Sequence, residues 1–108
     1  MLALTLVAYA SASPANQARV LQTAEPAKEV LIQNFVFTPP SLTIPVGTTV
    51  TWTNEDQAQH TATADDKSFD SGPLAQGASF SFTFTKEGTF PYICTFHPNM
   101  VGTIIVTK

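Results

Sequence analysis

The sequence has 108 residues, of which 44% are hydrophobic and 12% charged, and its net charge is −3. This length fits one folded domain, and the balance of apolar and charged residues excludes an intrinsically disordered chain. The small negative charge gives no basis for binding a polyanion, so no nucleic-acid partner is expected. A single cysteine cannot form a disulfide within the chain, so it is a buried apolar residue, a nucleophile or a metal ligand.

The N-terminal quarter has the composition of an export signal followed by a linker. Residues 1–12 are apolar and uncharged and end in small-x-small patterns, which are typical of signal cleavage sites. We therefore predict an export signal or its remnant. This predicts a periplasmic or other extracytoplasmic location for the protein. The alternative is an N-terminal arm. The apolar run is shorter than the roughly 20 residues that cross a bilayer, so no membrane span is expected in the mature domain. Residues 13–28 contain two prolines and small polar residues and read as a linker or arm, and residues 29–108 as the folded domain.

The folded part reads as short strands in chain order. Apolar, β-prone residues fill 30–37, closed by two prolines, and then 42–44, 48–53, 79–85, 89–94 and 101–107. Alternation places Val50 and Trp52 on one face, and Phe80, Phe82 and Phe84 on one face. No stretch has helical apolar spacing over three turns. The sequence therefore predicts an all-β fold, a Greek-key β-sandwich of seven or eight strands.

Four candidate metal ligands stand out against this pattern. Cys94, His97 and Met100 follow one another at intervals of three residues, after a predicted strand and before the last one, and His60 follows the polar stretch 54–59. A set of two imidazoles, one thiolate and a weak axial thioether serves copper in both its oxidation states. A loop between adjacent strands can bring Cys94, His97 and Met100 together, and His60 must then come from a neighbouring loop at the same end of the sandwich.

This motif resembles that of the small blue-copper proteins, the cupredoxins. The Cys-x-x-His-x-x-Met segment, the upstream His60 and the run at 50–54 are most similar to amicyanins, with plastocyanins and pseudoazurins as more distant relatives, over about residues 29–108. The resemblance implies one type 1 copper ion bound by the imidazole nitrogens of His60 and His97, the thiolate of Cys94 and, at longer distance, Met100. It also implies a non-enzymatic carrier that shuttles single electrons between redox partners.

Three further residues are given roles beside the ligands. Related cupredoxins place polar residues at the positions of Thr61 and Thr95, where they form hydrogen bonds between the two ligand loops, and such bonds would orient the ligands. Phe96 occupies a position where amicyanins typically have proline. Because Phe96 keeps its backbone N–H, we expect it to donate a hydrogen bond to the Cys94 sulfur.

The expected docking surface surrounds His97, whose edge should be the most exposed part of the site and the route for electrons. An apolar patch suited to weak, transient docking is expected at Phe96, Pro98, Pro73 and Leu74. Acidic pairs at 55–56 and 65–66 would steer a basic partner such as a c-type cytochrome. A dehydrogenase or an oxidase is the other kind of redox partner expected, and the protein is expected to be a monomer.

Other functions remain open at this point. The four residues also fit a copper-handling protein that stores or delivers the ion, or a metal-free interaction module. Delivery sites tend to be open and Met-rich, whereas this chain has two methionines. Hydrolysis with Cys94 as nucleophile lacks an evident orienting carboxylate, and zinc suits cysteine and histidine but not methionine. Taken singly, a cysteine such as Cys94, a histidine such as His60 or a methionine such as Met100 is more often an ordinary core or surface residue.

Overall fold

The computed structural model describes residues 27–108, so the predicted export signal and nearly all of the predicted linker lie outside the described residues. The described part contains eight strands and no helix: β1 (Lys28–Gln33), β2 (Val36–Thr38), β3 (Ser41–Pro45), β4 (Thr49–Asn54), β5 (Thr63–Ala64), β6 (Ser79–Thr83), β7 (Gly88–Cys94) and β8 (His97–Thr107). Accordingly, this part of the chain forms no helix that could cross a membrane.

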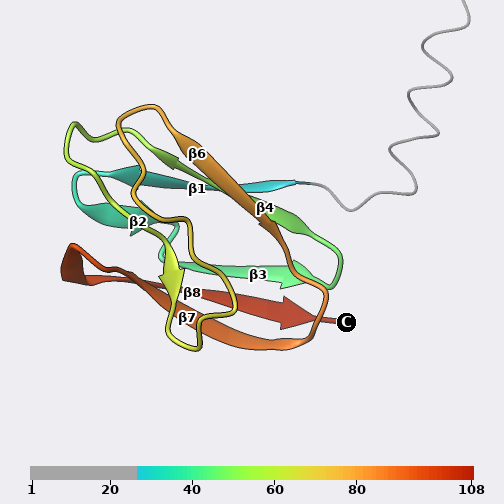
Figure 1. The fold of residues 1–108 in the computed structure, drawn as a ribbon. Coiled ribbons are helices and arrows are strands. Elements are labelled where there is room, and N and C mark those ends of the chain that lie inside the picture. The colour runs from blue at the N-terminus through green and yellow to red at the C-terminus, as the bar shows by residue number, and fades with distance from the viewer. Residues whose placement is uncertain (1–26) are drawn as a thin grey trace, which may run out of the picture.

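The strands form two four-stranded sheets, which Figure 1 shows as two facing layers. One sheet has the order β2-β1-β4-β6 and the other β3-β8-β7-β5. The pairs β1–β4 and β3–β8 are parallel, and the other pairs are antiparallel. The prediction of an all-β sandwich is confirmed.

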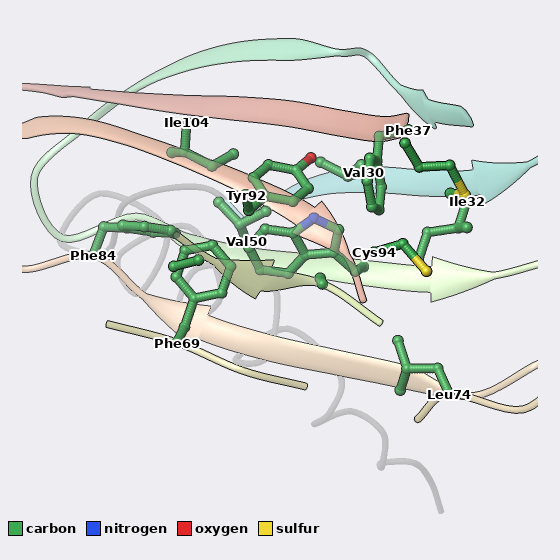
Figure 2. Packing of buried hydrophobic residues seen from close by; sticks show 14 of the residues in the cluster. Val30, Ile32, Phe37, Val50, Phe69, Leu74, Phe84, Tyr92, Cys94 and Ile104 are labelled. Carbon is green, nitrogen blue, oxygen red and sulfur yellow. The ribbon is translucent and has the colours of Figure 1, made fainter. Parts of the chain in front are cut away.

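The core between the sheets is built from the predicted alternation. Val50 and Trp52 are fully buried side by side on the inner face of β4. The Trp52 ring has aromatic neighbours on both sheets, with centroid distances of 5.8 Å to Phe80 of β6 and 5.5 Å to Tyr92 of β7. In Figure 2, Phe69 and Phe84 lie toward one end of this buried cluster and Cys94 toward the other. The aromatic residues therefore fill one end of the core, and the candidate metal site lies at the other end, beside Cys94.

The outer face of the β4–β6 pair carries hydroxyl groups. Three pairs of side-chain oxygens face each other across the two strands at 2.7, 2.7 and 2.8 Å: Thr49 with Thr83, Thr51 with Ser81 and Thr53 with Ser79. Such cross-strand hydroxyl pairs stabilise a sheet face that water also reaches. The polar half of the alternation is thus used for pairing across the strands.

The apolar stretch predicted at 30–37 is divided by a turn. Asn34 and Phe35 have positive φ angles of 56° and 61°, so the chain reverses there and β1 pairs with β2. Asparagine tolerates this conformation, but a bulky residue adopts it rarely. The turn is stabilised from outside the hairpin, because the Asp56 carboxylate accepts hydrogen bonds from both turn amides, at 2.8 Å from Asn34 and 3.0 Å from Phe35. Phe35 therefore leaves the sheet.

The last strand begins earlier than the predicted residue 101. In the structure β8 starts at His97, which pairs with Cys94, and the ladder has an irregularity between Ile93 and Cys94. Cys94 and His97 are thus the closing pair of a tight hairpin, and Met100 lies within β8 instead of in an open loop.

Candidate metal centre

The side chains of His60, Cys94 and His97 converge at one end of the sandwich. Their potential donor atoms all lie within 4.8 Å of one another. The Cys94 Sγ atom is 3.6 Å from His60 Nδ1 and 3.7 Å from His97 Nδ1. Ligands about 2.0 to 2.3 Å from a central ion, at angles of about 120°, would be separated by about 3.7 Å. The two distances from the Cys94 sulfur to the imidazole nitrogens therefore match those of a trigonal metal site.

Burial differs sharply among the four predicted ligands. Cys94 and His60 are completely buried, Met100 is 5% exposed, and His97 is half-buried. Met100 and His97 line the same surface hollow. Figure 2 shows Cys94 at the end of the apolar core. The site is therefore enclosed by protein on most sides, and the His97 imidazole is the part that reaches the surface.

The backbone around His60 is fixed by Asn54 and Leu74. His60 and Leu74 exchange two backbone hydrogen bonds of 3.2 and 2.8 Å. The buried Asn54 amide donates to the carbonyl oxygens of Ala58 and Leu74 at 2.9 and 2.8 Å, so it ties the loop to the strand. Asn54 follows the same period-two alternation as the core residues of β4, which was the one signal in the sequence for its inward orientation.

Asp56 determines which nitrogen of His60 is free. The Nε2 atom of His60 donates to Asp56 Oδ2 at 2.9 Å. Because a carboxylate only accepts, Nε2 carries the hydrogen and Nδ1 presents its lone pair toward Cys94, as a metal ligand requires. Burial alone would raise the pKa of Asp56, but hydrogen bonds from the Phe35 and Asn34 amides and from His60 hold that pKa below its usual value. Sequence reasoning treated Asp56 only as part of an acidic pair.

The Cys94 sulfur has one backbone donor from the other ligand segment. The Thr61 amide donates to Cys94 Sγ at 3.4 Å. The Thr61 hydroxyl also accepts from the Thr95 amide at 2.9 Å and lies 3.3 Å from the Thr95 hydroxyl, so the expected hydrogen bonds between the two segments are present. These bonds join segments that are 34 residues apart in the sequence.

The expected hydrogen bond from Phe96 to the sulfur does not form. Among the hydrogen bonds of residues 27–108, none runs from the Phe96 amide to Cys94 Sγ, and the donor is the Thr61 amide. In the tight hairpin Phe96 is a turn residue, and its side chain is 49% exposed. The prediction that the Phe96 amide donates to the Cys94 sulfur is therefore wrong.

The predicted docking patch changes in composition. Phe96, Pro98 and Pro73 are exposed, but Leu74 is 5% exposed and packs into the core, so its assignment to the surface was wrong. Its backbone pairs with His60, which turns its side chain inward (Figure 2). Phe35 was missed: it is 46% exposed and lines the hollow that also contains Phe96, His97, Pro98, Asn99 and Met100.

Comparisons with known proteins agree with this geometry. The cupredoxin-like domain family matches residues 1–106. Amicyanin-alpha from Methylorubrum extorquens is 35% identical over 88 residues, which are 72% of this chain and 70% of that protein. The structure of a purple cupredoxin from Nitrosopumilus maritimus is similar with a TM-score of 0.70 and 36% identity, and the match covers 74% of this chain and 99% of the other.

One similar structure is part of an enzyme. The copper-containing nitrite reductase from Thermus scotoductus matches with a TM-score of 0.72 and 35% identity over 77% of this chain, but over only 23% of the reductase. The fold therefore occurs both as a small separate protein and within a larger one.

Proposed function

This chain belongs to the cupredoxin-like family, and from that premise we propose that it is a type 1 copper protein that carries single electrons between redox partners. The observation that carries the proposal is the convergence of three donor atoms, with both histidine nitrogens at metal-site distances from the Cys94 sulfur. We propose His60 Nδ1, His97 Nδ1 and the Cys94 thiolate as the strong ligands and Met100 as the weak axial ligand.

Copper bound there supplies a one-electron couple between Cu(I) and Cu(II). The contribution of the protein is to keep its ligands in nearly the same place in both states. His60 is held by Leu74 on its backbone and by Asp56 on its ring. Cys94 accepts from the Thr61 amide and closes a strand hairpin. Side chains held in this way rearrange little, which favours fast electron transfer.

Electrons would enter and leave through the half-buried imidazole of His97. Within residues 27–108, the hollow around it is lined by Phe35, Phe96 and Pro98 and by no Asp, Glu, Lys or Arg side chain. Such an apolar surface suits brief docking of a redox protein, and we propose a c-type cytochrome, a dehydrogenase or an oxidase as the class of partner. We also propose that the protein acts outside the cytoplasm, since residues 1–12 have the composition of an export signal.

A carrier fits the burial of the ligands better than an enzyme or a copper-delivery protein. Two of the three converging side chains are fully buried, so neither a substrate nor an acceptor protein reaches them directly. Copper delivery requires that ligands be exchanged with a partner. A buried thiolate between two held imidazoles favours retention of the ion.

The experiment that tests this function is a visible absorption spectrum of the purified protein after addition of Cu(II), with Cys94→Ala as the control. We expect an intense band at about 600 nm from the copper–thiolate bond, which is absent in the control. The band should disappear on one-electron reduction and return on reoxidation. A colourless protein that retains metal would indicate a zinc or copper-handling site. Absence of metal binding would overturn the proposal.

A further inference from the structure

One aromatic ring that is not a proposed ligand contacts both histidines. The ring centroid of Phe35 lies 4.8 Å from that of His60, at an interplanar angle of 89°, and 4.9 Å from that of His97, at 88°. Both are edge-to-face arrangements within the usual distance range for aromatic pairs. The two imidazoles themselves are 5.1 Å apart and tilted by 59°. A single phenyl ring therefore restrains the orientation of both imidazoles.

The placement of this ring depends on the turn between β1 and β2. Phe35 has a φ of 61°, a conformation that a bulky residue adopts only when its surroundings hold it there. The Asp56 carboxylate stabilises this conformation, because it accepts hydrogen bonds from the backbone amides of Asn34 and Phe35. The same carboxylate accepts a hydrogen bond from His60 Nε2. One side chain thus connects the turn, the phenyl ring and the buried histidine.

We propose that the β1–β2 turn is a positioning element for the metal centre, in which Asp56 fastens the turn to His60 and Phe35 fixes the ring orientation of both histidines. This inference rests on the proposed function at one point, which is that His60 and His97 are metal ligands. An imidazole has to point one nitrogen at the ion, and rotation about its Cβ–Cγ bond moves that nitrogen away. His97 is half-buried and has a free side toward water, so the Phe35 ring limits that rotation.

The exposure of Phe35 fits this role. Its ring is 46% exposed although it is large and apolar, so burial of its own surface does not account for its placement. Replacement by leucine should therefore leave the fold intact while it removes the edge-to-face contacts.

The test compares Phe35→Leu with two other variants of the full chain. Phe35→Tyr keeps the ring and should restore wild-type behaviour. Val36→Thr is the matched control, because Val36 is the next residue of the same hairpin and is also exposed. Threonine keeps the β-branched shape of valine, and neither side chain has a ring that could pack against an imidazole. The measurements are the electron paramagnetic resonance spectrum of the Cu(II) protein and the rate of copper release to a chelator.

We expect the rhombicity of the Phe35→Leu spectrum to differ from that of the wild type. We also expect copper release from this variant to be about tenfold faster, a change in rate that corresponds to the loss of two edge-to-face contacts. Phe35→Tyr and Val36→Thr should match the wild type in both measurements. A Phe35→Leu protein with wild-type spectrum and release rate would overturn the proposal. So would an equal effect of Val36→Thr, since the change would then follow from the hairpin and not from the ring.

A second measurement needs no metal. In nuclear magnetic resonance spectra of the metal-free protein, the His97 ring signals of Phe35→Leu should show broadening from exchange between orientations, whereas those of the wild type stay sharp. Equally sharp signals in both proteins would overturn the positioning role. Failure of the wild type to bind copper would refute the proposed function, and the ring signals would still decide this inference.

Discussion

The substitution Thr61→Val tests the connection between the two ligand segments. The Thr61 hydroxyl, which is buried, has three neighbours: the Thr95 amide at 2.9 Å, the Thr95 hydroxyl at 3.3 Å and the Thr63 hydroxyl at 3.0 Å. In the variant, Thr63 keeps its bond to Asp70 at 3.0 Å, and the exposed Thr95 side chain can turn to water. The Thr95 amide alone loses its partner, so the free energy of unfolding should fall by about 1–2 kcal/mol.

The assay is urea unfolding of the metal-free protein, followed by copper release from the loaded protein. Thr61→Ser is the control, because it keeps the hydroxyl and should unfold like the wild type. The Thr61 amide still donates to Cys94 Sγ in both variants, so the comparison isolates the side chain. We expect faster copper release and a shifted reduction potential only for Thr61→Val. A Thr61→Val protein with wild-type unfolding free energy, copper retention and potential would refute the reasoning.

Three other predictions concern the packing around the site. A Cβ atom on Gly102 would clash with the Tyr92 ring, so Gly102→Ala should lower the free energy of unfolding by about 1–3 kcal/mol. A wild-type midpoint in urea unfolding would contradict this. Burial raises the pKa of Tyr92 to about 12, so the folded protein favours the neutral phenol. This contribution to the free energy of unfolding is fully present below about pH 10 and is lost between about pH 10 and 12. The loss should amount to about 3 kcal/mol. Tyr92→Phe should not show that loss, and parallel stability curves for the two proteins would contradict the assignment. Leu74→Ala should lower the free energy of unfolding by about 2–5 kcal/mol because it opens a cavity beside His60. The control Val101→Ala, at an exposed position, should change it by less than about 0.5 kcal/mol. Equal effects in urea unfolding would show that Leu74 is not a core residue.

The sequence predicted those features that depend on local alternation and spacing. Val50 and Trp52 face the core because residues two apart share a face, and this needs no knowledge of distant partners. The intervals from Cys94 to His97 and Met100 pointed to the metal site because a hairpin keeps such residues at one end. The burial of Asn54 is consistent with the same alternation, but the sequence places this residue in the polar stretch 54–59.

The features that escaped prediction depend on contacts between distant residues. Phe35 read as a strand residue because its neighbours are apolar, and only the carboxylate of Asp56, 21 residues away, stabilises the turn that moves it to the metal site. Leu74 read as a surface residue because it follows Pro73 in a stretch of glycines and polar residues. Its burial follows from backbone pairing with His60, which the sequence does not specify.

The separation of the donor groups along the chain has a consequence for the order of events during folding. Cys94 and His97 are three residues apart and meet when one hairpin forms, whereas His60 is 34 residues from Cys94. Local contacts form early and distant ones late, so the complete donor set exists only after the segment that carries His60 has joined the strand that ends at Cys94. A chain that captures the ion before that step would hold it by the hairpin alone. Metal content at the end of refolding therefore reports how many molecules have joined these two segments, and the rate of colour development reports how quickly they do so.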